Sequence, residues 1–203
     1  CLLRPAGDRP AGCRPGPGRN RPPSQTILFA AGDPALKGHS GDDRGIVEYS
    51  ELFQRGIADP ARIMAMPSLP GTRREIEGVR SMFDPGQTIA LMGSAATEGS
   101  VKSNPGLANA RYVLFSTHGL LASETGLDGE PGLVFTPPLA GAQSDRDDGL
   151  LTASEAAQLK LAADIVVLSA CNTASSNGSA EADGLSGLAQ SFFYAGAGSL
   201  LVS

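Results

Sequence analysis

Short, continuous apolar runs separated by helix-like stretches constrain the fold of this chain more than any other feature. The runs stand at residues 26–31, 88–92, 111–116, 165–169 and 199–202. Continuous apolar runs, as opposed to alternating ones, are typical of strands that are buried on both faces. Because long stretches separate the runs, the connections can cross over from one strand to the next. The pattern therefore predicts a mostly parallel sheet between two helical layers, an α/β three-layer sandwich.

Two Thr-x-x-Glu patterns indicate where helices begin. Thr72 and Glu75 form a capping box, which predicts a helix of about 11 residues with an apolar stripe at Ile76, Val79 and Phe83. Thr152 and Glu155 form a second capping box, and we expect its helix to reach Leu159. Residues 35–70 carry weaker signals. There we expect residues 63–64 to be extended.

The first 25 residues differ in composition from the rest of the chain. Ten of them are Pro or Gly, and five arginines stand against the single acid Asp8. Such a segment buries too little apolar surface to offset the entropy of ordering it. We therefore expect residues 1–25 to be a disordered leader and residues 26–203 to form one domain. The whole chain carries −5, so removing the +4 leader leaves an acidic domain of −9.

Composition excludes several classes of protein. A net charge of −5 does not suggest a nucleic-acid binder, and no apolar run is long enough for a membrane span. The N-terminus has no apolar stretch of the kind found in secretory signals, so we expect a cytoplasmic protein. Three cysteines and two histidines without metal-ligand spacing predict neither a disulfide framework nor a metal site, and we expect no cofactor.

His118 and Cys171 each follow a strongly apolar run by one or two residues. In open parallel sheets, functional groups gather beyond the carboxyl ends of the strands, so the two side chains meet if their strands are neighbours. An imidazole beside a thiol can activate it as a nucleophile and can protonate a leaving amine. The amides of Gly119 and Cys171 could then form an oxyanion hole.

Each of these residues also has an ordinary structural explanation. A cysteine after an apolar strand is usually a small buried side chain, and a His-Gly pair is often a turn. Asp33 follows the first apolar run and could receive a substrate Arg or Lys, although Asp33-Pro34 is more typical of a turn start. Asp183 and the nearby Glu181 are weaker candidates for substrate binding, because acids at a helix start favour the helix dipole. We expect His39 to be exposed to solvent.

Several segments carry a resemblance to one family. Residues 115–119 (FSTHG) and 166–174 (VVLSACNTA) look like the two signature blocks of the CHAT domain family of caspase-like cysteine peptidases. Further similarity occurs at LFAAGDP (28–34), LPGTRREIE (69–77), 93–98, GLLTASEAAQL (149–159) and GLSGLAQSFFYAGAGSLLVS (184–203).

The resemblance implies a caspase-hemoglobinase-type sheet with His118 as general acid/base, Cys171 as nucleophile and Gly119 in the oxyanion hole. It also implies that the chain is a fragment, incomplete at its C-terminus, of a protein with N-terminal tetratricopeptide or other sensor repeats. The substrate would be a protein or peptide. Metacaspases place an Asp two residues before the Cys, where this chain has Ser169, so the resemblance predicts no substrate specificity.

Two main functional hypotheses follow. The first is a cysteine-type endopeptidase domain, the effector part of a larger sensor–effector protein. The second is a catalytically inactive caspase-like module for interaction or signalling. A small-molecule-binding α/β domain is a third and more distant option. The sequence has no G-x-S-x-G elbow and no phosphate-binding P-loop, and a dinucleotide-binding interpretation of Gly196-Ala197-Gly198 is weak.

Overall fold

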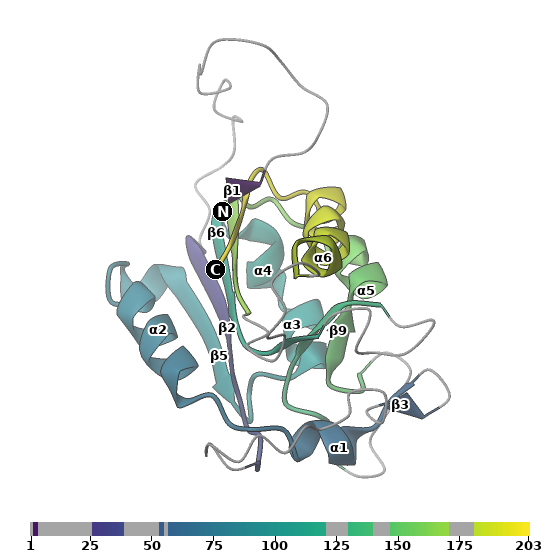
Figure 1. Ribbon diagram of the computed structural model, residues 1–203. Coiled ribbons are helices and arrows are strands. Elements are labelled where there is room, and N and C mark those ends of the chain that lie inside the picture. The colour runs from purple at the N-terminus through teal and green to yellow at the C-terminus, as the bar shows by residue number, and fades with distance from the viewer. Residues whose placement is uncertain are drawn as a thin grey trace.

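A six-stranded sheet forms the centre of the structure, a computed structural model that describes residues 2–3, 26–38, 53–54, 57–120, 130–139, 147–170 and 181–203 (Figure 1). The strand order is β1-β11-β10-β6-β2-β5, and all neighbours are parallel except β1 and β11. The bounds are β1 Leu2–Leu3, β2 Leu28–Pro34, β5 Thr88–Gly93, β6 Tyr112–Ser116, β10 Ile165–Ser169 and β11 Leu200–Val202. Each of the five expected apolar runs is therefore a strand, and the mostly parallel sheet is confirmed.

Helices cover both faces of this sheet, as expected for an α/β/α sandwich (Figure 1). On one face lies α2 (Pro70–Arg80), which buries Ile76 against Ala30 and Leu114. The other face carries the larger core, in which Phe115 packs against Phe135 and Phe192. The helices in Figure 1 on that side are α3 (Glu98–Ser103), α4 (Pro105–Asn109), α5 (Ala153–Gln158) and α6 (Glu181–Ala195).

The start of α2 differs from the sequence prediction. The helix has the expected length of 11 residues, but it begins at Pro70 and has no side-chain cap. Proline favours the first helical position because its missing N–H needs no partner there. Thr72 is consequently inside the helix, where its hydroxyl donates to the carbonyl of Leu69. The predicted capping box at Thr72 is therefore wrong, and Glu75 makes a different contact described below. The second box, Thr152 with Glu155, is confirmed at the start of α5.

A smaller antiparallel sheet adjoins the carboxyl end of the main sheet. It comprises β7 (Gly119–Leu120), β8 (Gly132–Val134) and β9 (Leu150–Thr152), in that order. Near it lie the short hairpin of β3 (Phe53–Gln54) and β4 (Ile57–Ala58) and the helix α1 (Pro60–Met64). A 3-10 turn at Pro85–Gln87 lies at the opposite end of the main sheet, just before β5. Residues 63–64 are therefore helical and not extended, because Asp59 caps α1 and Ile63 turns into a core with Met66 and Leu120.

A buried ionic network fixes the small sheet to two helices. The carboxylate of Glu98 is fully buried and accepts hydrogen bonds from the amides of Asp148 and Gly149, at 2.9 and 3.1 Å. The ammonium of Lys102 lies 2.5 Å from Glu98 and 2.8 Å from Glu155. Burial raises the pKa of Glu98 to about 7, although Lys102 opposes this shift. The segment that leads into β9 is thus held by hydrogen bonds to a buried carboxyl group.

None of the helices in the described ranges has the length and hydrophobicity of a membrane span.

Glu98 generates a prediction about stability and pH. Its folded pKa of about 7 exceeds its ordinary value of 4.5, so the folded chain keeps a proton that the unfolded chain releases. The native state therefore loses stability as pH rises through this window, by up to about 1.4 kcal/mol for each pH unit between the two pKa values. Because Glu98→Gln has no proton to lose, we expect its unfolding free energy relative to the native chain to rise between about pH 5 and about pH 8.

Urea unfolding at the two pH values measures this difference. Glu77→Gln, at an exposed position on α2, is the matched control and should show no such trend. A difference between Glu98→Gln and the native chain that stays constant would mean that Lys102 keeps Glu98 ionised throughout.

Candidate functional site

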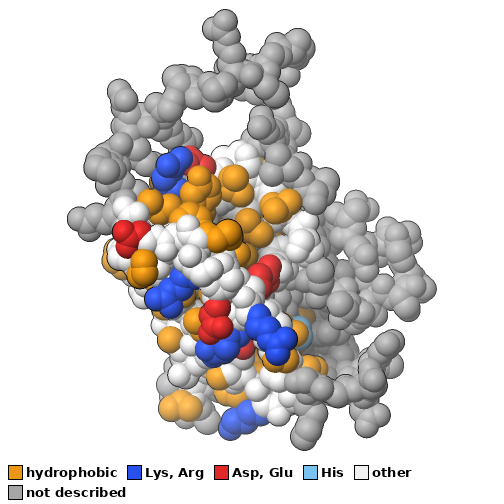
Figure 2. Space-filling view, turned by 90° about the vertical axis from the view of Figure 1, so that its left-hand side faces the viewer, with side chains coloured by type: hydrophobic (Ala, Val, Ile, Leu, Met, Phe, Trp, Pro, Cys, Tyr) orange, Lys and Arg blue, Asp and Glu red, His pale blue; other side chains and the backbone are white. Residues whose placement is uncertain are grey.

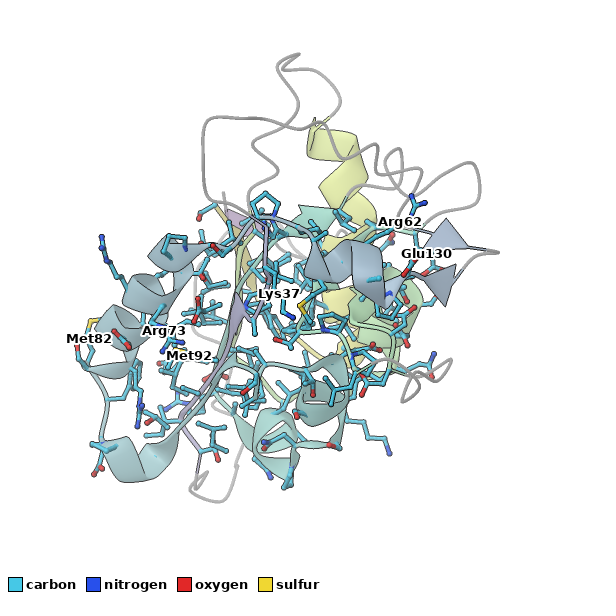
Figure 3. The ribbon with its side chains drawn as sticks, turned by 90° about the horizontal axis from the view of Figure 1, so that it is seen from below. Lys37, Arg62, Arg73, Met82, Met92 and Glu130 are labelled. Carbon is cyan, nitrogen blue, oxygen red and sulfur yellow. The ribbon has the colours of Figure 1, made fainter. Side chains whose placement is uncertain are left out.

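The strands β6 and β10 end side by side. They pair in parallel over their whole length, and the last pair joins Ser116 to Ser169. One further hydrogen bond, from the Thr117 amide to the Ser169 carbonyl at 3.1 Å, extends the ladder beyond β6. The chain therefore leaves both strands at the same edge of the sheet, which is the edge that faces the viewer in Figure 3.

The backbone around His118 is held between the two sheets. The hydroxyl of Thr117 donates to the carbonyl of Val134, and the amide of Val134 donates to the carbonyl of His118 at 2.9 Å. Thr117 is almost fully buried, so these bonds form in a low-dielectric environment that strengthens them. The position of the His118 backbone is thus defined by β8 on one side and by β10 on the other.

The ring of His118 is oriented by a backbone carbonyl. Its Nε2 lies 2.8 Å from the carbonyl oxygen of Pro67. A carbonyl can only accept, so Nε2 carries the hydrogen and the neutral ring has its lone pair on Nδ1. Pro67 is itself fixed, because the residues before and after it bond to Gly38 at 2.9 and 3.3 Å. Burial lowers the pKa of His118, and the Pro67 carbonyl partly opposes this effect.

Gly119 lies against the end of β10. A side chain on this buried residue would place its Cβ 3.0 Å from the carbonyl oxygen of Ala170, which is closer than such atoms normally approach. The antiparallel ladder also constrains the direction of its amide. His118 and Val134 form a hydrogen-bonded pair, and such pairs alternate with non-bonded ones, so the pair of Gly119 with Leu133 is non-bonded. The amide of Gly119 therefore points away from β8.

Other predicted site residues are described only in part. Cys171 lies outside the described residues, which extend to Ala170 on this side. Asp183 belongs to α6, and Glu181 is the first residue of that helix, but both side chains lie outside the description. His39 also lies outside it. The substrate-binding role of Asp183 stays a prediction.

Asp33 is already engaged by a basic side chain of the protein. It sits at an irregularity near the end of β2 with a left-handed φ of 49°, a conformation that Asp tolerates better than most residues. Its carboxylate lies 2.5 Å from the guanidinium of Arg73 on α2, which Figure 3 shows beside the end of the sheet. This pairing supports the structural explanation of Asp33. Its role in substrate binding stays a prediction.

Glu75 makes a contact that the capping-box interpretation does not foresee. Its Oε2 accepts a hydrogen bond of 2.5 Å from the hydroxyl of Ser116, the fully buried last residue of β6. A glutamate three residues after a threonine fits a capping box equally well, so local sequence alone does not reveal this long-range contact. The structure brings Glu75 to the strand end that leads into His118.

Among the described residues, no group of three His, Cys, Asp or Glu side chains could hold a metal ion.

The chain matches one family of known proteins. The model of the CHAT domain matches residues 17–203, a range that begins within the expected leader and contains every element that forms the edge described above. Comparison with the curated proteins gives no match. The match to the CHAT domain agrees with the mostly parallel sheet and its flanking helices, which are consistent with a caspase-like fold. The chain therefore belongs to the CHAT domain family, a caspase-like family related to peptidases.

Proposed function

We propose that this chain is a cysteine-type endopeptidase domain in which His118 and Cys171 form the catalytic pair. The observation that carries the proposal is the parallel register of β6 and β10. Its last pair, Ser116 with Ser169, stands two residues before His118 on one strand and two residues before Cys171 on the other. Equal distances along neighbouring strands favour contact between the two side chains at the sheet edge.

The proposed reaction begins with a proton transfer. The Nδ1 atom of His118 takes the proton from the thiol of Cys171, and the thiolate attacks the carbonyl carbon of the scissile peptide bond. The tetrahedral intermediate carries an oxyanion, which the amides of Gly119 and Cys171 would stabilise by about 3–4 kcal/mol per donor. The imidazolium then protonates the leaving amine. Water hydrolyses the remaining thioester, with His118 as the base that accepts the water proton.

Two features of the described residues support these roles. The bond from Nε2 to the Pro67 carbonyl selects the tautomer whose Nδ1 can accept a proton, and it stabilises the imidazolium once that forms. The amide of Gly119 is not used in the β7–β8 ladder, which is what an oxyanion donor requires.

Cleavage of a peptide library tests the proposal directly. We expect Cys171→Ala to abolish cleavage, and His118→Ala to reduce kcat by about 10²- to 10⁴-fold, because general acid–base catalysis contributes rate factors of this size. Cys13→Ala in the leader is the matched control and should cleave like the native chain. Cleavage that persists in Cys171→Ala would assign the activity to another residue.

The pH dependence of thiol labelling provides a second test that needs no substrate. Because burial lowers the pKa of His118 below its ordinary value of 6.5, its neutral, proton-accepting form persists into mildly acidic solution. We expect labelling of Cys171 by iodoacetamide to fall off only below about pH 6.5. In His118→Ala, labelling should begin only as a free thiol ionises, near about pH 8.5.

Mass spectrometry of the Cys171 peptide at a series of pH values gives both curves. Coincident curves for the native chain and His118→Ala would favour an inactive interaction module instead.

A further inference from the structure

We propose that Glu75 is the specificity residue of this site and selects a cationic side chain, arginine or lysine, on the substrate residue next to the scissile bond. The inference rests on the proposed endopeptidase function and deepens it by naming a substrate class. Three observations carry it: the place of the carboxylate, its charge balance and the surface beside it.

The carboxylate lies beside the end of the strand that carries His118. Glu75 is on α2, a helix that begins just after Pro67, the residue that orients the His118 ring. Its Oε2 is 2.5 Å from the hydroxyl of Ser116, two residues before His118. Ser116 pairs in register with Ser169, which stands two residues before Cys171. A substrate side chain that enters beside the catalytic pair would therefore approach Glu75.

The charge of Glu75 is not balanced by a neighbouring cation. Arg73, on the same helix, pairs with Asp33 at 2.5 Å and lies 3.9 Å from Glu77. Within the described part of the chain, no cation lies within ion-pair distance of Glu75, and its hydrogen bond comes from a neutral hydroxyl. A half-buried carboxylate with only a neutral donor gains more from an incoming cation than one that is already paired.

The surface beside Glu75 suits a long aliphatic stem. On this face α2 packs over β2, β5 and β6, whereas the residues of β10 on the same side remain half-exposed at Ile165, Val167 and Ser169. Figure 2 views the molecule from the side on which α2 lies in Figure 1. Arginine and lysine bury their methylene stems on apolar surface while their charged ends meet an acid. Val167 packs against the cluster that contains Ile76, the residue after Glu75, so apolar surface and a carboxylate lie on the same face of the sheet.

The contact with Ser116 separates into a structural part and an electrostatic part. Glutamine at position 75 keeps an oxygen that accepts the Ser116 hydrogen bond, so the anchoring of α2 to β6 is retained. Only the negative charge is lost. Glu75→Gln therefore tests the charge without removing the anchor.

Cleavage of two peptides that differ only by arginine or citrulline before the scissile bond tests the inference. Citrulline has the same shape as arginine but no charge. We expect the native chain to prefer arginine by about ten- to hundredfold in kcat/KM, the range of a hydrogen bond to a charged group. The ratio should fall to near one in Glu75→Gln and stay unchanged in Glu77→Gln. If Glu75→Gln does not fold, Glu75→Asp should keep a smaller arginine preference.

A labelling experiment separates failure of this inference from failure of the proposed function. Cys171 is labelled with two methanethiosulfonates of similar size, the ethylammonium and the ethylsulfonate, and Cys171→Ala supplies the background. We expect the cationic reagent to react faster, and Glu75→Gln to remove that preference.

Three combinations of results separate the two proposals. Cleavage without an arginine preference, or with a preference that survives in Glu75→Gln, overturns the role of Glu75 and leaves the endopeptidase intact. No cleavage of any peptide, together with a labelling preference that depends on Glu75, supports a cation-selective site and overturns the endopeptidase. No cleavage and equal labelling overturn both.

Discussion

The parallel pairing of β6 with β10 is the constraint on which the rest of this edge depends. Ser116 and Ser169 end the ladder together, and the next hydrogen bond, from Thr117 to Ser169, carries the alignment one residue further. A slip of one residue in such a ladder moves every side chain to the opposite face of the sheet. The same pairing sets Gly119 against Ala170 and holds Ser116 where Glu75 reaches it.

Polar contacts between elements that are distant in sequence connect the strands at this edge. Thr136, which is almost fully buried beyond β8, accepts a bond from the amide of Ala35 at 2.9 Å and donates to the carbonyl of Gly93 at 2.8 Å. One hydroxyl thus connects the chain that follows β2, the end of β5 and the small sheet. Together with the network around Glu98, it adds directional hydrogen bonds to the apolar packing at this end of the sheet. Buried hydrogen bonds of this kind fix geometry more strictly than apolar contacts do.

The sequence reveals the strands better than the contacts between them. Apolar runs such as residues 165–169 indicate the strands, because a strand that is covered on both faces is apolar at nearly every position. The start of α2 is harder to predict, because Thr72 and Glu75 satisfy a local capping rule while the actual partner of Glu75 is 41 residues away along the chain. The place of His118 after a strand makes it a candidate from sequence alone. Pro67, its ring partner, has no sequence signal because it acts through a carbonyl that every residue possesses.

A main-chain acceptor for the His118 ring has an evolutionary consequence. Exchange of the amino acid at position 67 leaves the carbonyl oxygen in place. A substitution at this position then leaves the hydrogen bond to the imidazole in place, whereas an insertion or deletion near it would move the oxygen away from the ring. The hydrogen bond therefore constrains the length and path of the loop and not the residue type at position 67. An alignment scored by residue type would pass over a position that a comparison of backbone traces would find at once.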